Sequence, residues 1–265
     1  METNKLIKLT DSEYFGEKDF FNFSLIKELI KSPLHFQEAR KEEKEPTPAM
    51  KLGTTIHTAL LEPLRFANEY LEEPQLDKRT KEYKEFAAKN QDKFLYSGKD
   101  VNPILNKLEA IKKENNQTAY PSLLRVLNQK TINENCIFWD NFKCKIDAYD
   151  QETKTLIDIK TTSDSSPESF IKTIFNSAYN LQLAHYAKGL ESCDQKVATY
   201  KIIAIQTTAP YDVVEYELPL DVMDCSFLKL QELYKKLENV LIFDDHTGTN
   251  KGEVVIVEFP KWFNF

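Results

Sequence analysis

The chain has 265 residues, of which 41% are hydrophobic, and its formal net charge is −7 at neutral pH. A chain of this length can bury a full core, and its acidic balance excludes a global basic field that would coat nucleic acid, while a locally basic groove stays compatible with it. The four cysteines are scattered without a C-x-x-C pair, which argues against structural zinc and against a disulfide framework.

The N-terminal Met-Glu-Thr-Asn-Lys lacks the basic and then apolar pattern of a signal peptide. No apolar run approaches the roughly 18 residues that a membrane span needs. Only 6 glycines occur, and none forms a phosphate-cradling loop. We therefore expect a cytoplasmic protein without a membrane partner, and neither nucleotide hydrolysis nor dinucleotide binding.

The first half of the chain is predicted to be mainly helical. Residues 23–31 form a helical pattern with Ser24 as the N-cap. Residues 49–62 place apolar side chains at helical spacing with His57 among them, and a lone histidine on such a helix is more often a core residue than a ligand. The Lys- and Glu-rich residues 77–116 are also predicted to be helical, mostly as a solvent-exposed face.

Two strands with acidic residues follow, at 142–150 and 156–162. The polar residues between them are suited to a hairpin turn. If this turn centres near Glu152, Asp147 lies opposite Ile157 or Asp158 across the ladder.

Asp158 and Lys160 are expected to project from one face of the second strand, because residues two apart share a face, while Ile157 and Ile159 point into an apolar layer. The carboxylates of Asp147 and Asp158 then converge with the Lys160 ammonium. Carboxylates this close repel each other unless a cation lies between them, and oxygen ligands suit Mg²⁺ or Mn²⁺ better than zinc. The residues thus predict a hard divalent ion as cofactor.

The triplet Asp158-Ile159-Lys160 is a weak signal by itself, because an acid, any residue and then lysine recurs elsewhere in the chain. Only this copy lies in a Leu- and Ile-rich strand, where an unpaired charge would be unfavourable. The alternative is an ion pair between Asp158 and Lys160 on an edge strand. These residues alone leave both interpretations open.

Downstream, residues 166–175 are predicted to form a helix, and a second helix begins at Tyr179 and ends at Gly189 as its C′ residue. Gln182 and Tyr186 are four apart and share one face of it, although a polar rim on a packing helix would look the same. The remaining predicted elements are strands at 197–206 and 211–218 and an amphipathic helix at 221–240, with Leu228, Leu230, Leu233 and Leu237 as core candidates.

The order of these elements resembles the PD-(D/E)XK nuclease superfamily in its RecB-like branch, and more closely RecE-type exonuclease VIII. The resemblance covers most of the chain, from about Phe23 to Trp262. One departure is Ile146, where the family often has proline, a position that is not a ligand. The resemblance is carried by Ser32 to Phe36, Pro46 to Thr54, His57, Leu61 to Pro63, Glu134, Phe138, Trp139, Asp147, Asp158 to Thr162, Tyr179, Gln182 and Tyr186.

This resemblance implies an α/β fold with a PD-(D/E)XK restriction-endonuclease-like core, in which a mixed central β-sheet is flanked by helices and an N-terminal helical portion precedes it. We expect a single nuclease domain over 1–265, made of a mainly helical portion (1–130) with His57, a catalytic sheet with the Gln/Tyr helix (131–220), and a C-terminal helix and tail (221–265). Iron–sulfur relatives need a cysteine quartet near the ends that this chain lacks, so no cluster is expected.

The resemblance also implies roles for individual residues. Lys160 would orient or help deprotonate the attacking water and stabilise the developing phosphorane charge. Gln182 and Tyr186 would steady the scissile strand, and Glu134 is a further catalytic candidate whose alternative role is to support the sheet. The ligands of Mg²⁺ or Mn²⁺, expected as two ions, would be His57, Asp147, Asp158 and the backbone carbonyl of Ile159.

The implied activity is 5′-to-3′ degradation of one strand of linear double-stranded DNA, which exposes single strands for a RecT-type annealing protein in recombination. Such enzymes form ring-like tetramers that DNA threads, and an acidic exterior is compatible with lysines on the inner wall. A bacterial or phage origin is expected. The alternatives are a PD-(D/E)XK endonuclease or CRISPR-associated nuclease with the same metal site, and a catalytically silent DNA-binding scaffold on the same fold.

Overall fold

The computed structural model of the protein describes residues 2–41 and 45–256, so the Pro260 and Trp262 of the resemblance lie outside the described residues. The strands are β1 (Tyr70–Glu72), β2 (Phe94–Tyr96), β3 (Ile132–Trp139), β4 (Phe142–Asp150), β5 (Thr155–Thr162), β6 (Thr199–Gln206) and β7 (Val213–Leu218). The helices are α1 (Asp11–Gly16), α2 (Phe23–Ile26), η1 (Lys27–Ile30), α3 (Pro33–Lys41), α4 (Pro48–Leu61), α5 (Pro63–Glu69), α6 (Lys81–Lys89), α7 (Gly98–Glu114), α8 (Pro121–Leu127), α9 (Pro167–Asn176), α10 (Tyr179–Ser192), α11 (Leu220–Phe243) and η2 (Thr249–Gly252).

Five strands form one mixed sheet in the order β3-β4-β5-β6-β7. Strands β3, β4 and β5 are antiparallel neighbours, β5 and β6 run parallel, and β6 and β7 are antiparallel. A parallel pair needs a crossover connection, which α9 and α10 provide here. The prediction of a mixed central sheet is therefore confirmed, and the crossover brings the Gln/Tyr helix back against the strand that carries Asp158 and Lys160.

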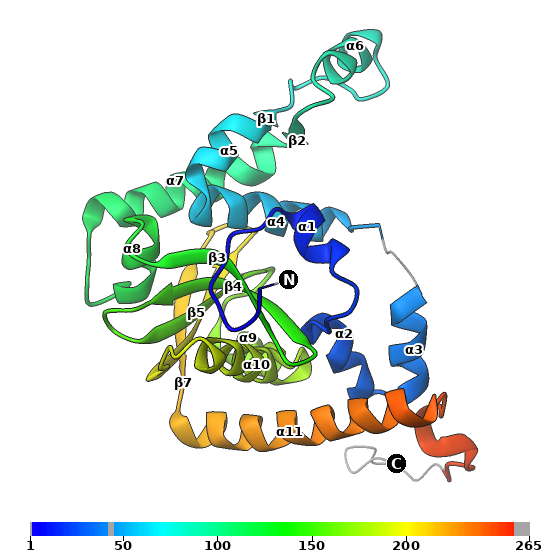
Figure 1. The fold of residues 1–265 in the computed structure, drawn as a ribbon. Coiled ribbons are helices and arrows are strands. Elements are labelled where there is room, and N and C mark those ends of the chain that lie inside the picture. Colours follow the sequence, from blue (N-terminus) through cyan, green and yellow to red (C-terminus); the bar gives the residue numbers. More distant parts are fainter. Residues whose placement is uncertain (1, 42–44, 257–265) are drawn as a thin grey trace, which may run out of the picture.

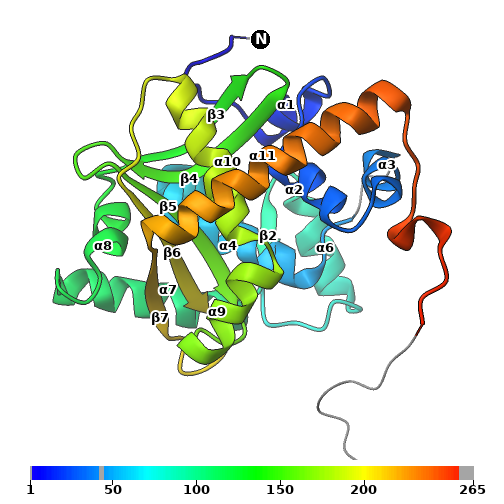
Figure 2. The ribbon, with the colours of Figure 1, turned by 90° about the horizontal axis from the view of Figure 1, so that it is seen from below.

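Helices cover both faces of this sheet, as Figures 1 and 2 show. Helices α4, α7 and α8 pack on one face, where Ile157 and Ile159 of β5 are fully buried. Helices α9, α10 and α11 cover the other face and share a core with Leu156 of β5. Strand β5 is buried over its first five residues and partly exposed over its last three, so its side chains reach solvent only at the C-terminal end.

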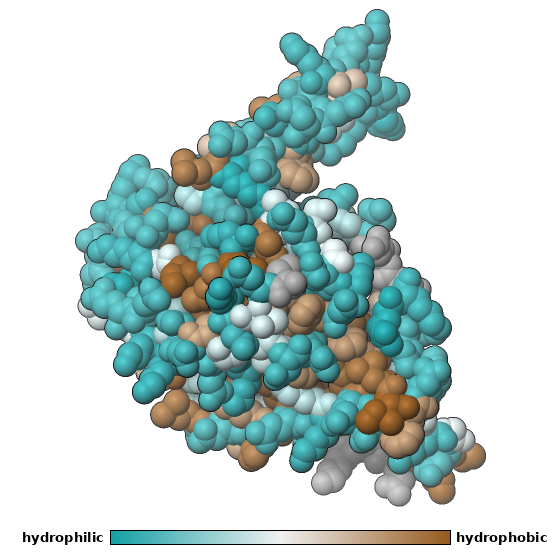
Figure 3. Space-filling view, in the orientation of Figure 1, coloured by the Kyte–Doolittle hydropathy of each residue, from teal (hydrophilic) through white to brown (hydrophobic). Residues whose placement is uncertain are grey.

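The segment with β1, α6 and β2 projects away from the body of the protein (Figure 1). Its surface is mainly hydrophilic (Figure 3). The prediction of one helical stretch over 77–116 is only partly right, because β2 separates α6 from α7. This strand forms because it pairs with β1, where the rings of Tyr70 and Phe94 lie 5.1 Å apart.

Two predicted helix ends are wrong. The N-cap of α2 is Asn22, whose side chain accepts a hydrogen bond from the Leu25 N–H. The predicted N-cap, Ser24, lies inside this helix. Helix α10 does not end at Gly189 but runs on to Ser192. A Cβ on Gly189 would lie 2.9 Å from the Cys144 sulfur, so this glycine permits close packing and does not serve as a cap. Within the described ranges, no helix is both long and apolar enough to cross a membrane.

Candidate active site

The hairpin of β4 and β5 positions the first two carboxylates. Its register pairs Ala148 with Ile157, and continuing the ladder by one residue places Asp147 opposite Asp158, as predicted. Asp147 Oδ2 accepts a hydrogen bond of 2.7 Å from the Ile159 N–H. The main chain of β5 therefore holds the Asp147 carboxylate beside Asp158.

Asp158 and Lys160 form a buried pair at the exposed end of β5. The Lys160 Nζ donates a hydrogen bond of 3.0 Å to Asp158 Oδ1 and lies 2.8 Å from Oδ2. Asp158 is fully buried, and its Oδ2 has no hydrogen-bond partner among the described residues. The ion pair of the alternative interpretation is therefore present, but its placement on an edge strand is wrong, because β5 is the middle strand of the sheet.

Helix α4 carries His57 to the same place. His57 Nδ1 lies 3.8 Å from Asp147 Oδ2. The helix approaches β5 closely, since a Cβ on Gly53 would lie 3.1 Å from Thr161 Oγ1. Glycine at this position lets the backbone of α4 come close enough for His57 to face the carboxylates.

Glu134 reaches the site from β3 through an unusual backbone. It lies opposite Asp147 in the β3–β4 ladder, and its φ is 51°, the left-handed region that non-glycine residues seldom adopt inside a strand. Ligand atoms of His57, Glu134 and Asp147 all lie within 4.8 Å of one another. The side chain of Lys145 caps this group, with its Nζ 2.5 Å from Glu134 Oε2.

Helix α10 lines the other side of the site. Gln182 Nε2 donates a hydrogen bond of 2.6 Å to the Tyr186 hydroxyl, which ties the two predicted residues together. Burial first, and then the nearby carboxylates of Asp147 and Asp158, raise the pKa of Tyr186 well above its usual value, so its hydroxyl stays protonated. The ring of Tyr179 lies 4.7 Å from the Lys160 Nζ, a cation–π contact that supports the ammonium.

The electrostatics of the site favour a cation. Burial raises the pKa of Asp158 to about 6, and it also raises the pKa of Asp147 and of Glu134. Burial opposes the charge of Lys160, but its contacts with Asp158 and Asp147 outweigh that effect and raise its pKa. Burial lowers the pKa of His57, which favours the neutral imidazole that metals bind.

These residues fit a hard divalent ion. Asp158 Oδ2 is buried and accepts no well-aligned hydrogen bond from the described residues; its neighbour is the Lys160 Nζ at 2.8 Å, so the oxygen keeps a lone pair that an ion would satisfy. The donors are carboxylate oxygens and one imidazole, with no thiolate nearby, a set that suits Mg²⁺ or Mn²⁺. The structure thus contains a possible acidic metal-binding cluster, and the predicted ligands Asp147, Asp158, His57 and Ile159 all lie in it or against it.

Sequence reasoning missed three residues of this site. Tyr179 and Lys145 were not singled out for a role, and Asp11 of α1 binds Lys145 at 2.9 Å from 134 positions away in the sequence. Lys145 carried a possible signal, because it lies two residues before Asp147 on the same strand and so shares its face. Asp11 had no local signal.

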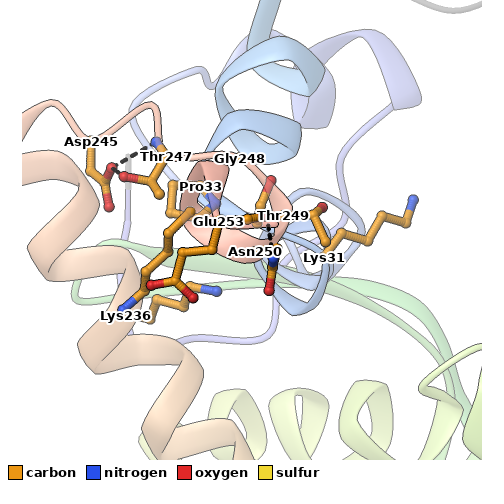
Figure 4. A pocket seen from close by; sticks show the side chains of 11 residues that line it. Lys31, Pro33, Lys236, Asp245, Thr247, Gly248, Thr249, Asn250 and Glu253 are labelled. Atoms are coloured by element: carbon orange, nitrogen blue, oxygen red, sulfur yellow. Dashed lines mark hydrogen bonds between the residues drawn. The ribbon is translucent and has the colours of Figure 1, made fainter. Parts of the chain in front are cut away.

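A separate hollow lies away from the candidate site, between α11 and the segment around η2 (Figure 4). It has a volume of about 610 Å³ and is lined by residues that include Lys31, Lys236 and Asp245. The Nζ of Lys31 and of Lys236 are already engaged, by Glu28 and by the Leu29 carbonyl. None of the predicted site residues lines this hollow.

Residues 22–248 match a protein family described as a PDDEXK-like domain of unknown function, DUF3799. The chain belongs to this family. Among curated proteins none matches the sequence. The PD-(D/E)XK fold, predicted from the resemblance, is therefore confirmed at the level of the superfamily.

Several solved structures match the chain, among them the following two. A protein from Eubacterium rectale named "Putative exonuclease" aligns with a TM-score of 0.65 and 11% identity, over 96% of this chain and 97% of that one. A phage related exonuclease from Haemophilus somnus 129PT aligns with a TM-score of 0.30 and 13% identity, over 55% of this chain and 77% of that one, and carries no weight here. The first likeness shows a shared fold along the whole chain.

Proposed function

We propose that this protein is a Mg²⁺-dependent exonuclease that degrades one strand of linear double-stranded DNA from the 5′ end. The observation that carries the proposal is the convergence of Asp147, Asp158 and Lys160 at the exposed end of the central strand, with His57 facing them from α4. The similar protein from Eubacterium rectale, which shares the fold over 96% of this chain, is named an exonuclease, which supports an exonuclease over an endonuclease.

Asp147, Asp158, His57 and the carbonyl of Ile159 would hold the ion. When bound, a divalent ion supplies positive charge to the scissile phosphate and lowers the pKa of a nearby water. The side chains and backbone of the protein hold the ligands of this ion in place. Asp147 is fixed by the Ile159 N–H, and Asp158 by Lys160, so both ligands are preorganised.

Lys160 would stabilise the charge that develops on the phosphate. Its ammonium is held by Asp158 and faces the ring of Tyr179, so it is fixed at the end of β5. A fixed cation next to the reacting phosphate stabilises the transition state without rearranging. Gln182 and Tyr186, joined by their hydrogen bond, would donate to the backbone of the scissile strand beside Lys160.

The test is digestion of linear duplex DNA labelled at one 5′ end, with Mg²⁺ or with EDTA and with a covalently closed circle in parallel. Lys160→Met keeps the length of the side chain and removes its charge. The matched control is Lys229→Met, which removes the charge of an exposed lysine of α11 whose ion pair within the described ranges is with Glu232. We expect Mg²⁺-dependent release of the 5′ label by the wild type and the control, an intact circle, and loss of activity in Lys160→Met.

Each other outcome has a defined meaning. A nicked or linearised circle would show an endonuclease. Cleavage that persists in Lys160→Met would remove Lys160 from the mechanism. No cleavage of any substrate with Mg²⁺ or Mn²⁺ would favour the catalytically silent scaffold.

We also propose that the protein works as a ring-like homotetramer and supplies single strands to an annealing protein of the RecT type. The net charge of −7 supports a ring, because topology can retain DNA where bulk attraction does not. A molar mass measured by light scattering after gel filtration should be four times 30.9 kDa. A monomer at micromolar concentration would contradict the ring.

A further inference from the structure

Lys145 binds two carboxylates at the edge of the candidate site. Its Nζ is 2.5 Å from Glu134 Oε2 and 2.9 Å from Asp11 Oδ1, and its side chain is only 17% exposed. Glu134 itself belongs to the closest group of ligand atoms in the described part of the chain, together with His57 and Asp147. One carboxylate of that group is therefore already occupied by an ammonium.

Lys145 cannot easily leave this position. Its second partner, Asp11, accepts through Oδ2 a hydrogen bond of 2.9 Å from Arg65. Arg65 of α5 is in turn bound to Glu62, the N-cap of this helix, and to Glu69 at its end. This network holds Asp11 in place, so moving Lys145 would break its ion pairs with Glu134 of β3 and with a fixed Asp11 of α1.

The backbone of Glu134 points to the same arrangement. A left-handed φ of 51° in the middle of β3 is an unfavourable conformation for glutamate, and it persists because the surrounding contacts hold it. Those contacts include the Lys145 ammonium. The Glu134–Lys145 pair is therefore among the contacts that keep this backbone conformation beside Asp147.

The charges of the site then suffice for one divalent ion. Glu134 is paired with Lys145 and Asp158 with Lys160, whereas Asp147 has no lysine or arginine within ion-pair distance among the described residues, although Lys160 and Lys145 both act on its charge. Asp147 accepts a hydrogen bond from the Ile159 N–H and lies beside the His57 ring. Asp11, the second partner of Lys145, is itself paired with Arg65, so of the site carboxylates only Asp147 lacks an ion pair with a lysine or arginine of the described ranges. The number and charge of the oxygen ligands set how many divalent ions a site can hold.

We propose that the Lys145 ammonium takes the place of a second metal ion, so that the site holds one divalent ion, on the side of Asp147 and Asp158. This differs from the two ions that the resemblance implied, and it rests on the proposed function only in requiring a metal site. Replacing Lys145 by an uncharged residue frees Glu134 and creates a second ion site between Glu134 and Asp147. Lys145 is thus a residue that determines metal stoichiometry.

The experiment is titration of the full-length protein with Mn²⁺, followed by calorimetry for stoichiometry and by electron paramagnetic resonance for coupled Mn²⁺ pairs. We expect one ion per chain in the wild type and in Lys145→Arg. We expect two ions and a coupled-pair signal in Lys145→Met. The second ion should disappear when Glu134→Gln is added to Lys145→Met, while Asp158→Asn in the wild-type background should abolish the first.

The outcomes separate this inference from the proposed function. Two ions in the wild type would overturn it, whatever the variants do. One ion in both the wild type and a folded Lys145→Met would overturn it and leave the proposed nuclease intact. No ion in the wild type would overturn the metal site itself. If Lys145→Met fails to fold by circular dichroism, Lys145→Gln carries the same expectation, because it is uncharged and keeps a polar end for Asp11.

Discussion

Glycine at position 134 should stabilise the protein relative to alanine, the reverse of what a β-strand normally shows. Both substitutions remove the carboxylate and leave Lys145 with Asp11, so their difference isolates the backbone. The φ of 51° at Glu134 is unfavourable for any residue with a Cβ by roughly 1 to 2 kcal/mol, and glycine avoids it. Glycine loses more conformational freedom on folding, which offsets about 0.5 to 1 kcal/mol of that gain.

The net expectation is that Glu134→Gly is more stable than Glu134→Ala by about 0.5 to 1 kcal/mol. The control is Ala148→Gly on the neighbouring strand, where the backbone is extended and the side chain fully buried. There glycine should destabilise the protein by about 1 to 2 kcal/mol, from lost conformational freedom and one lost methyl group.

The assay is urea unfolding followed by circular dichroism, with free energies extrapolated to water for the four proteins. A Glu134→Gly variant less stable than Glu134→Ala would refute the left-handed backbone at this position. DNA cleavage should fall equally in both variants, because both lack the carboxylate. Unequal activities would show that the backbone conformation, and not the charge, is what the site requires.

Three further predictions concern stability. Burial lowers the pKa of His185 to about 4, so below its usual pKa of 6.5 the unfolded chain binds a proton more readily than the folded one. Between pH 7 and pH 4 this group alone should lower the free energy of unfolding by roughly 3 kcal/mol. The measurement is the difference between the wild type and His185→Gln in urea titrations at each pH, because the raised pKa of Asp158 acts in the opposite direction and is common to both proteins. Gly189→Ala should lower the melting temperature, although alanine has the better helix propensity, because the new Cβ would lie 2.9 Å from atoms of Cys144 and of Trp139. An unchanged melting temperature would mean that these two side chains can move away from the helix. EDTA should leave the protein folded, since Lys145 and Lys160 already pair with two of the three site carboxylates, whereas Mg²⁺ should raise the melting temperature; unfolding by EDTA would contradict those pairs.

Strand and helix periodicity predicted most of the elements that carry the site. The alternation around Asp158 and Lys160 identified the strand, its apolar face and its hairpin partner, because a buried central strand leaves little freedom of register. On α11 the same reasoning failed at Leu228, which is 63% exposed while Leu230 is buried. Two residues apart on a helix means about 200° of rotation, so both cannot face one core.

The alternation of polar and apolar residues could not predict that the apolar side chains of β4 change from one face of the sheet to the other. Ile146 and Tyr149 both belong to the core under α10 and α11, while Ala148 belongs to the core under α4. A regular strand would place Ile146 with Ala148, so the pleat changes side at Asp147, opposite the left-handed Glu134. The change thus coincides with the left-handed backbone of a residue on the neighbouring strand, and the alternation of residue types within β4 does not indicate it.

The same exchange explains how one hairpin can present acids to a shared site while its flanks stay apolar. Before Asp147, the residues on its face point toward α1, where Lys143 donates to main-chain carbonyls and Lys145 binds Asp11. After Asp147, the next residue of β4 on that face is Tyr149, which belongs to the core under α10. Asp147 lies at the change itself, where the N-terminal segment, α4 and α10 all come within reach. A site at such a point contains charged residues from distant segments of the chain. The triplet Asp158-Ile159-Lys160 lies within one strand and could be predicted from the sequence. The pairing of Lys145 with Asp11 joins residues 134 positions apart and could not.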